Sequence, residues 1–228
     1  SFSRCHFWST DFRDAKFLVQ VRFDESTFSK DQGFDRVKFL ERADFSKIVA
    51  HQGFCCSEAV FAAPVTFRAA KFEGRFASNE ATGLALYSAG FDHDRTRFLS
   101  IADFSDCQFN STTDLSVTEF HLAPLFHNAR LHSDTRLRDT TFFDTRSPDA
   151  AHHYRALRSL LKAADAVDRE HDILALELKS RTAGLHRLGL RSIATSLYGA
   201  LSDFGRSFVR PLIYLCALYL AFYLSALS

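Results

Sequence analysis

The chain has 228 residues, with 28 Lys and Arg against 27 Asp and Glu. A net charge of +1 excludes the strongly basic or acidic composition that is typical of proteins that bind or mimic polyanions. The chain contains 25 Phe and no Met, and because it opens at Ser1 we expect it to be a fragment or a processed form.

The five cysteines form no CxxC pair, and two of them are adjacent. An odd number without metal-ligand spacing predicts reduced thiols that serve as small hydrophobic side chains in a cytosolic setting. These cysteines are Cys5, Cys55, Cys56, Cys107 and Cys216.

In residues 1–146 a large residue recurs at alternating steps of six and five. Strands alternate every 2 residues and helices repeat every 3.6, so neither sets this rhythm. The first series is Phe17, Phe23, Phe28, Phe34, Phe39, Phe45, Ala50, Cys56, Phe61, Phe67 and Phe72, with Ala and Cys at two of its positions. The second is Phe98, Phe104, Phe109, Leu115, Phe120, Phe126, Leu131, Leu137 and Phe142.

The residue two places before most of these positions is small or β-branched, as Ala102 and Cys107 are. One large and one small inward residue per segment predict a square tube that turns a corner every five or six residues. Four segments make one coil, since Phe17 and Phe39 are 22 positions apart. Successive coils stack at about 4.8 Å, the spacing of paired strands. We expect Phe17, Phe39 and Phe61 to form one column, and Phe98, Phe120 and Phe142 another.

The runs "VKFLERADF" and "ADFSDCQF" resemble the pentapeptide-repeat family, in particular its Phe-rich membrane-protein branch. The resemblance covers about residues 1–146 and implies an all-β solenoid, a right-handed quadrilateral β-helix. It says little about chemistry, since a fold does not fix a function. The structural ladder is predicted at Phe17, Phe39, Phe61, Phe98, Phe104, Phe109, Phe120, Phe126 and Phe142.

The ladder is interrupted between Phe72 and Phe98, where Phe76, Leu86 and Phe91 do not continue its phase. We expect either an irregular face or an extruded loop, and this is the first place to look for a recognition feature. The acidic and histidine side chains at 92–94 are consecutive and cannot easily face one ion, so a solvated turn is favoured over a metal site.

Residues 147–182 have helical spacing and predict a helical hairpin that caps the solenoid and shields its last strand edges. Ser147 is the expected N-cap, with Pro148 at the first helical position and Asp149 in the first turn. The adjacent His152 and His153 point about 100° apart on a helix, so solvated polar residues are favoured over metal ligands.

Residues 183–207 predict a basic amphipathic helix beside a membrane, with an ordinary helix packed on the cap as the alternative. Residues 208–228 predict a transmembrane segment, because 211–228 carry no charge. These 18 residues rise about 27 Å as a helix, close to the ~30 Å hydrocarbon thickness. A buried helix of a soluble protein is the alternative. Upstream Lys and Arg place residues 1–210 on the cytoplasmic side of the inner membrane.

The run "YGALSDFGRSFVRPL" resembles a junction in bacterial membrane proteins that join pentapeptide repeats to C-terminal transmembrane helices. Some such proteins are ion-channel-like. Neither a pore loop nor a second helix is present in this sequence, so channel activity is left open. The matching positions are Ser202, Asp203, Phe204, Gly205, Arg206, Ser207, Arg210 and Pro211.

No motif for a nucleophile, phosphate loop, dinucleotide or zinc occurs, so we expect no enzyme, no cofactor and no metal. The function expected is a membrane-anchored scaffold that binds the lipid bilayer and an unidentified protein, but no nucleic acid; a homo-oligomer is left open. The alternative is a DNA mimic that binds a type II topoisomerase. With 18 Lys and Arg against 20 Asp and Glu, residues 1–146 copy a duplex charge of one per ~1.7 Å poorly.

Overall fold

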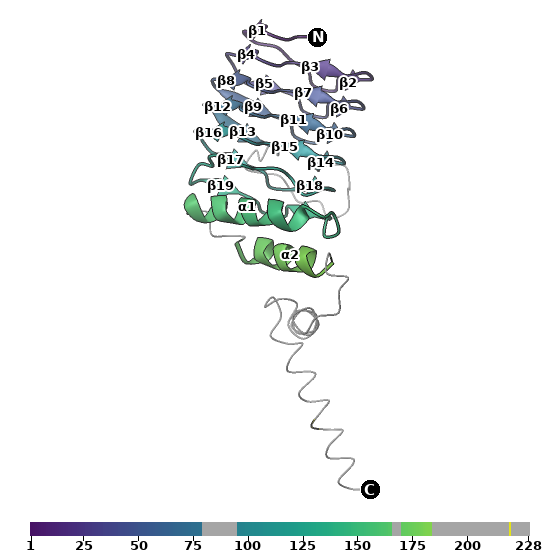
Figure 1. Cartoon of the computed structure of the whole chain (residues 1–228). Helices are drawn as coiled ribbons and strands as arrows, with labels where there is room; N and C mark the ends of the chain where they lie inside the picture. Colours follow the sequence, from purple (N-terminus) through teal and green to yellow (C-terminus); the bar gives the residue numbers. More distant parts are fainter. Residues whose placement is uncertain (79–94, 166–169, 184–218, 220–228) are drawn as a thin grey trace.

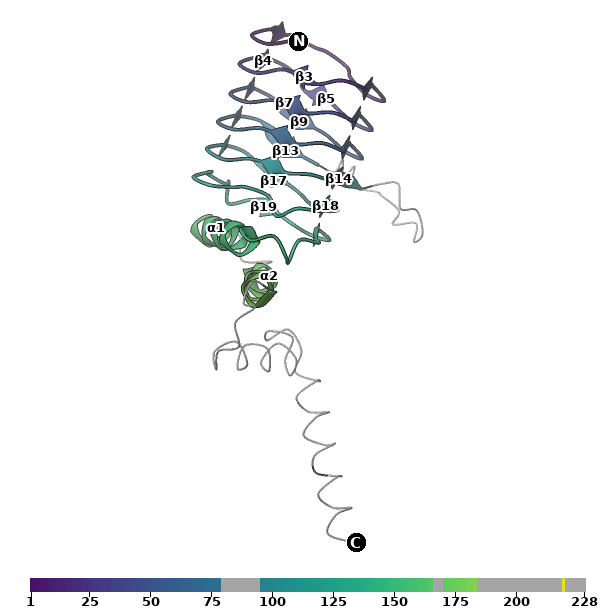
Figure 2. The same ribbon diagram turned by 45° about the vertical axis from the view of Figure 1, so that its right-hand side comes forward.

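A computed structural model describes residues 1–78, 95–165, 170–183 and 219. Its first part is a parallel β-solenoid of about six turns, and two helices follow it (Figure 1). The architecture is consistent with the one that the resemblance implies. Figure 2 shows the turns as stacked rungs, with both helices below the last of them.

The solenoid has four faces, each a parallel sheet, numbered here in the order in which the chain visits them. Face 1 comprises β1 (His6–Phe7), β4 (Thr27–Phe28), β8 (Val49–Ala50), β12 (Lys71–Phe72) and β16 (Gln108–Phe109). Face 2 comprises β5 (Gln32–Gly33), β9 (Gly53–Cys55), β13 (Arg75–Ala77), β17 (Thr113–Asp114) and β19 (Thr135–Arg136).

Face 3 comprises β2 (Lys16–Phe17), β6 (Lys38–Phe39), β10 (Val60–Phe61), β14 (Thr96–Phe98), β18 (Thr118–Phe120) and β20 (Thr141–Phe142). Face 4 comprises β3 (Val21–Arg22), β7 (Ala43–Asp44), β11 (Val65–Thr66) and β15 (Ala102–Asp103). The four edges between the faces are called corners 1–2, 2–3, 3–4 and 4–1.

The phenylalanines of face 3 form one continuous stack through the solenoid. Successive ring centroids lie 4.8–5.4 Å apart, and the rings are within 9° of parallel. The expectation of two separate columns is therefore wrong. Phe61 and Phe98 are 37 positions apart instead of 22, yet their rings stack at 4.8 Å. The extra length falls at residues 79–94, which lie outside the described residues.

Stacks of the same kind line the other faces. On face 4, successive centroids of Phe23, Phe45, Phe67, Phe104 and Phe126 are 4.9–5.1 Å apart. Rings of neighbouring faces meet edge to face, as in the pair Phe39 and Phe45 at 5.8 Å and 86°. Offset stacks along the axis and edge contacts across it are the two favoured arrangements of aromatic rings, so the rings contact one another in both directions of the bore.

Face 2 exchanges its large and small positions in two successive turns. Phe54 pairs with Gln32 and Phe76 pairs with Phe54, so both rings occupy the small-residue position. The large position holds Cys56 in the turn of Phe54 and Ser78 in the turn of Phe76, and both side chains are buried. Phe76, expected to be out of phase, thus lies inside the bore and stacks on Phe54 at 5.9 Å. Each of these two turns thus still contributes one buried ring on face 2, although the order of the large and the small residue is reversed.

Two kinds of corner explain the alternation of six and five. Each described five-residue step contains a residue with positive φ, and most close an i to i+3 hydrogen bond, as from Ala15 N to Phe12 O at 3.0 Å around Asp14 at φ 62°. This is the arrangement of a type II turn. The described six-residue steps contain no such residue. The positive-φ residues of the solenoid are Arg4, Asp14, Glu25, Arg36, Lys47, Glu58, Ala69, Asp106, Val117, Asn128 and Asp139.

Val117 is the one β-branched residue among these, at φ 55°. A β-branched residue in the left-handed region is strained, whereas Asn tolerates it. We expect Val117→Asn to raise the free energy of unfolding by about 0.5–1 kcal/mol, measured by urea denaturation. The control Val60→Asn, in strand β10, should lower it because Asn is disfavoured in strands. Destabilisation by both changes would contradict the turn assignment.

The helix α1 (Ala150–Ala163) covers the last turn of the solenoid (Figure 1). The Tyr154 hydroxyl donates to the carbonyl oxygen of Asp144 at 2.7 Å, and its ring meets that of Phe142 edge to face at 5.8 Å. Leu157 and Leu161 are buried in the same core as the phenylalanine stacks. The helix therefore seals the end of the aromatic bore, as expected of a cap.

The N-cap of α1 is Asp149, so the expected Ser147 is wrong. The Asp144 carboxylate accepts hydrogen bonds from the amides of Ser147 and Arg146 at 3.0 and 3.1 Å. Burial raises the pKa of Asp144, but these amide bonds outweigh it, so its pKa lies below the usual value. Ser147 is held in this turn, and its carbonyl accepts from the amide of Ala150 at 3.1 Å.

The helix α2 (Glu170–Ala183) packs on α1, so the two form the expected hairpin. Its Glu177 side chain is 2% exposed and lies within 2.6–3.1 Å of the guanidinium groups of Arg155, Arg158 and Arg181. A buried carboxylate is tolerated only with such charge-assisted partners. This cluster joins the two helices.

The described residues include no helix that is long and apolar enough to span a bilayer. The predicted amphipathic helix at 183–207 lies outside the described residues apart from Ala183. The predicted transmembrane segment at 208–228 also lies outside them apart from Tyr219.

Candidate interaction surface

The predicted ladder residues lie inside the solenoid. Seven of them, Phe39, Phe61, Phe98, Phe104, Phe109, Phe120 and Phe126, are at most 3% exposed. Phe17 and Phe142, at the two ends of the face 3 stack, are half-buried. Because a ligand cannot reach these rings, the ladder is structural, and any recognition must use the outer surface.

The predicted membrane junction from Ser202 to Pro211 lies outside the described residues, as do the acidic and histidine residues at 92–94. The structure brings His152 near a third histidine, since its ring lies 6.3 Å from that of His127 and 6.1 Å from that of His153. Within the described ranges, no three or more His, Cys, Asp or Glu are grouped so that they could hold a metal.

The buried thiols serve packing. Cys107 donates to the carbonyl oxygen of Phe67 at 2.9 Å, and Cys56 donates to that of Ala77 at 3.7 Å. Burial raises the pKa of both thiols, which keeps them protonated and poorly nucleophilic.

Two corners carry ion pairs that run along the solenoid axis. At corner 2–3, Arg36 donates two hydrogen bonds to Asp14 of the turn before it, at 2.7 and 2.9 Å, which lowers the pKa of Asp14. At corner 4–1, Glu25 lies between Arg4 and Lys47 at 2.9 and 3.2 Å. At these positions of both corners, side chains of opposite charge follow one another from turn to turn, so their charges largely cancel.

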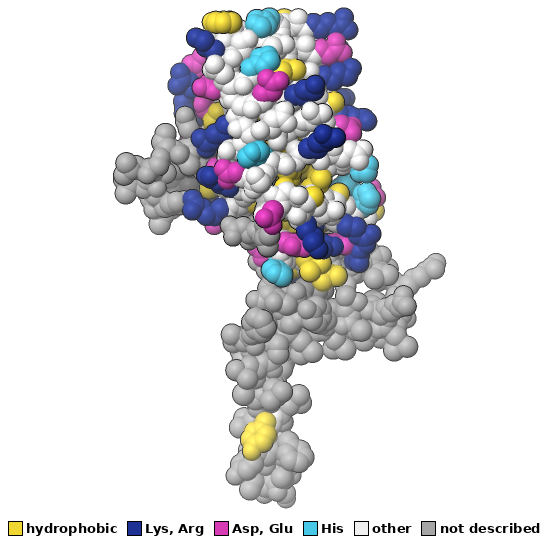
Figure 3. Space-filling view, turned by 90° about the vertical axis from the view of Figure 1, so that its left-hand side faces the viewer, with side chains coloured by type: hydrophobic (Ala, Val, Ile, Leu, Met, Phe, Trp, Pro, Cys, Tyr) yellow, Lys and Arg dark blue, Asp and Glu magenta, His cyan; other side chains and the backbone are white. Residues whose placement is uncertain are grey.

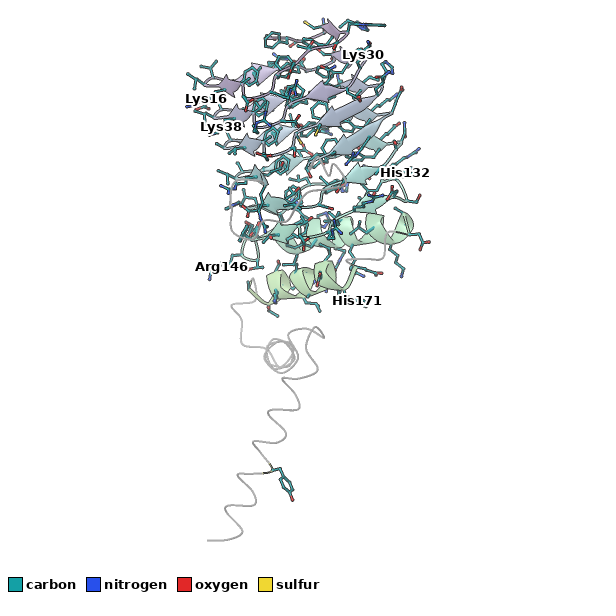
Figure 4. The ribbon with its side chains drawn as sticks, turned by 180° about the vertical axis from the view of Figure 1, so that it is seen from behind. Lys16, Lys30, Lys38, His132, Arg146 and His171 are labelled. Carbon is teal, nitrogen blue, oxygen red and sulfur yellow. The ribbon has the colours of Figure 1, made fainter. Side chains whose placement is uncertain are left out.

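Face 3 departs from this alternation. Lys16 and Lys38 are register partners in adjacent strands, so two cations lie one above the other. Figure 4 shows both on one side of the molecule, projecting outward, with Lys30 on the opposite side. Neither lysine has an ion pair within the part of the chain that the structure describes. Like charges directly opposite each other destabilise a sheet, so packing alone does not explain this pair.

These lysines border a groove of about 470 Å³ over face 3 and corner 2–3. Five of its nine lining residues are basic and two are acidic. The lining residues are Asp14, Ala15, Lys16, Arg36, Lys38, Glu58, Val60, Arg95 and Arg97. The groove is therefore cationic overall, with individual carboxylates between the cations.

Corner 3–4 is rich in exposed apolar side chains, and the charged pair Glu41 and Arg42 interrupts them in the second turn. It carries six of the nine exposed large hydrophobic side chains of the described residues, with exposed fractions between 40% and 72%. They are Leu18, Val19, Leu40, Leu99, Ile101 and Phe143. The third turn contributes Ala62, Ala63 and Pro64 to the same corner. By contrast, the side with face 1 shows charged groups of both signs and histidines (Figure 3).

The fold and this outer surface define the class of protein: a parallel β-solenoid with a helical cap, whose accessible feature is a long repetitive surface. No family model, no curated protein and no solved structure matches the chain.

Reasoning from the sequence missed this surface, although a signal was present. The triplets "KFL" at 16–18 and 38–40 and "RFL" at 97–99 each place a cation and a Leu on either side of a ladder phenylalanine. In a strand, neighbours of an inward residue point outward. The triplets therefore predict a basic column beside an apolar one once the coil period is known.

Proposed function

We propose that this protein is a membrane-anchored, non-enzymatic scaffold of the pentapeptide-repeat type, whose solenoid lies on the cytoplasmic side of the inner membrane and binds another protein. The observation that carries the proposal is the unbroken solenoid with a sealed aromatic bore, because it leaves only the outer surface for recognition. The groove, whose lining has more cations than carboxylates, and the exposed hydrophobic side chains of corner 3–4 support protein binding, since exposed patches of this kind mark interaction sites.

The proposed anchor rests on the sequence of residues 208–228, with the junction from Ser202 to Pro211 before it. The uncharged run at 211–228, preceded by Lys and Arg, suits a helix that crosses a bilayer from the cytoplasmic side. The right-handed sense of the solenoid and its membership in the pentapeptide-repeat family are also parts of this proposal.

Fractionation tests the anchor. We expect the full chain to stay in carbonate-washed membranes and a variant that ends at residue 207 to become soluble. Leu215→Arg with Leu218→Arg should also release the chain, because each central Arg costs about 2.5–3.5 kcal/mol of insertion free energy. The matched pair Leu215→Ala with Leu218→Ala should not release it. A full chain extracted by carbonate would contradict the proposal.

The DNA-mimic alternative has no specific support on this surface. The corners alternate in charge and face 3 is cationic, whereas a mimic of duplex DNA needs a continuous row of carboxylates. Inhibition of gyrase supercoiling by the full chain would nevertheless favour it over the scaffold.

A further inference from the structure

Corner 3–4 and the basic groove lie side by side along the solenoid axis. In three turns a cation, an inward phenylalanine and an exposed leucine follow one another, at 16–18, 38–40 and 97–99. The pairings of β2 with β6, of β6 with β10 and of β10 with β14 hold these triplets in register, with Val60, Phe61 and Ala62 between the second triplet and the third. The result is a largely apolar stripe, with a cation on its face 3 side in three of four successive turns.

The size of the stripe selects its occupant. Six turns at about 4.8 Å give a length of roughly 24 Å, and the stripe is only one corner wide. It covers roughly a few hundred Å², well below the ~800 Å² per partner of a standard interface. A second solenoid is therefore a poor match, whereas a single helix of about 16 residues spans the same length.

We propose that this surface binds an amphipathic helix of a partner protein, with its apolar side on corner 3–4 and Asp or Glu side chains facing Lys16 and Lys38. One helical turn rises about 5.4 Å, close to the ~4.8 Å between solenoid turns, so successive helical turns meet successive solenoid turns. The helix would neutralise the stacked pair Lys16 and Lys38. This inference rests on the protein-binding half of the proposed function.

The charges favour a helix over an anionic bilayer. Arg36 already pairs with Asp14, and Arg95 and Arg97 lie 3.8 and 3.5 Å from Glu119. A bilayer gains about 1 kcal/mol for each basic residue near its surface, and it would also meet these carboxylates. A helix can place its acidic side chains opposite the cations alone.

Fluorescence anisotropy with the full chain in phosphatidylcholine nanodiscs tests the proposal. The probe is a labelled peptide of about 16 residues with Leu along one side and Glu beside it. Its control is a shuffled peptide of the same composition without a continuous apolar side. We expect the patterned peptide to bind at least about tenfold more tightly. Leu40→Ser with Leu99→Ser, or Lys16→Glu with Lys38→Glu, should each weaken it by a similar factor.

The matched control is Lys71→Glu, which changes the residue before a ladder phenylalanine on face 1 and should leave binding unchanged. Thermal unfolding followed by circular dichroism checks that each variant is folded. Equal binding of both peptides, or equal loss with Lys71→Glu, would overturn the proposal.

Chemical labelling of lysines tests the bilayer as the occupant. Protection of Lys16 and Lys38 from labelling in phosphatidylserine nanodiscs, but not in phosphatidylcholine nanodiscs, would show that the bilayer occupies this surface and would overturn the proposal of a partner helix. Equal labelling in both kinds of nanodisc would support the partner helix. Loss of peptide binding by a chain that stays in carbonate-washed membranes would reject this inference alone and leave the anchor intact.

Discussion

Phe104→Ala is expected to lower the free energy of unfolding by about 3–5 kcal/mol, the cost of removing a buried aromatic ring. Phe104 is 0% exposed and stacks between Phe67 and Phe126 at 5.1 and 4.9 Å. It also meets Phe76 and Phe98 edge to face, at 6.1 Å each. The strands around it are fixed by pairing above and below, so the site cannot collapse to fill the cavity.

Urea denaturation followed by circular dichroism measures this effect. Leu99→Ala is the control from the same turn, because its side chain is 41% exposed, and its effect should stay within about 0.5 kcal/mol. A loss below about 1 kcal/mol for Phe104→Ala would show that the bore relaxes around a missing ring and is not closely packed.

The second large effect concerns the exchanged positions of face 2. Phe54→Cys should cost about 3–5 kcal/mol, because the ring fills space beside Phe34 at 5.1 Å and Phe45 at 5.7 Å. Cys56→Phe, which restores the regular ladder residue, should cost about 1–3 kcal/mol, because it adds a ring to a space that Phe54 already fills. The regular residue is therefore destabilising here.

The double variant, Phe54→Cys with Cys56→Phe, should recover part of the loss, because one ring again fills the space. We expect a favourable coupling of about 1–3 kcal/mol in a double-mutant cycle on urea denaturation. Strict additivity of the two single changes would show that the rings do not share one volume.

The period of the ladder predicted the solenoid because a closed four-sided coil leaves little freedom in where large inward residues can stand in the sequence. Each face needs one large inward residue, and a slip by one position would turn the side chains of a strand to the opposite side. The rhythm of six and five also has a physical cause, in corners with and without a positive-φ residue such as Asp14. For this reason the four faces and the cap could be predicted without any coordinates.

The errors came from packing that position alone does not record. Phe76 seemed out of phase because the bore accepts a ring from either of two neighbouring positions on a face. Ser147 seemed a good N-cap, but Asp144 binds its amide at 3.0 Å and so shifts the helix start. The basic groove was missed because it depends on which outward side chains become neighbours through the 22-residue period, as Lys16 and Lys38 do.

The unbroken stack across the extra segment has a consequence for how such a protein can diversify. Phe61 and Phe98 lie in contact although residues 79–94 separate their turns in sequence. Each turn bonds only to the one above and the one below, so a length of chain grafted between two turns leaves the register of the others untouched. An insertion between two turns can therefore vary in sequence during evolution while the surfaces of all other turns stay the same.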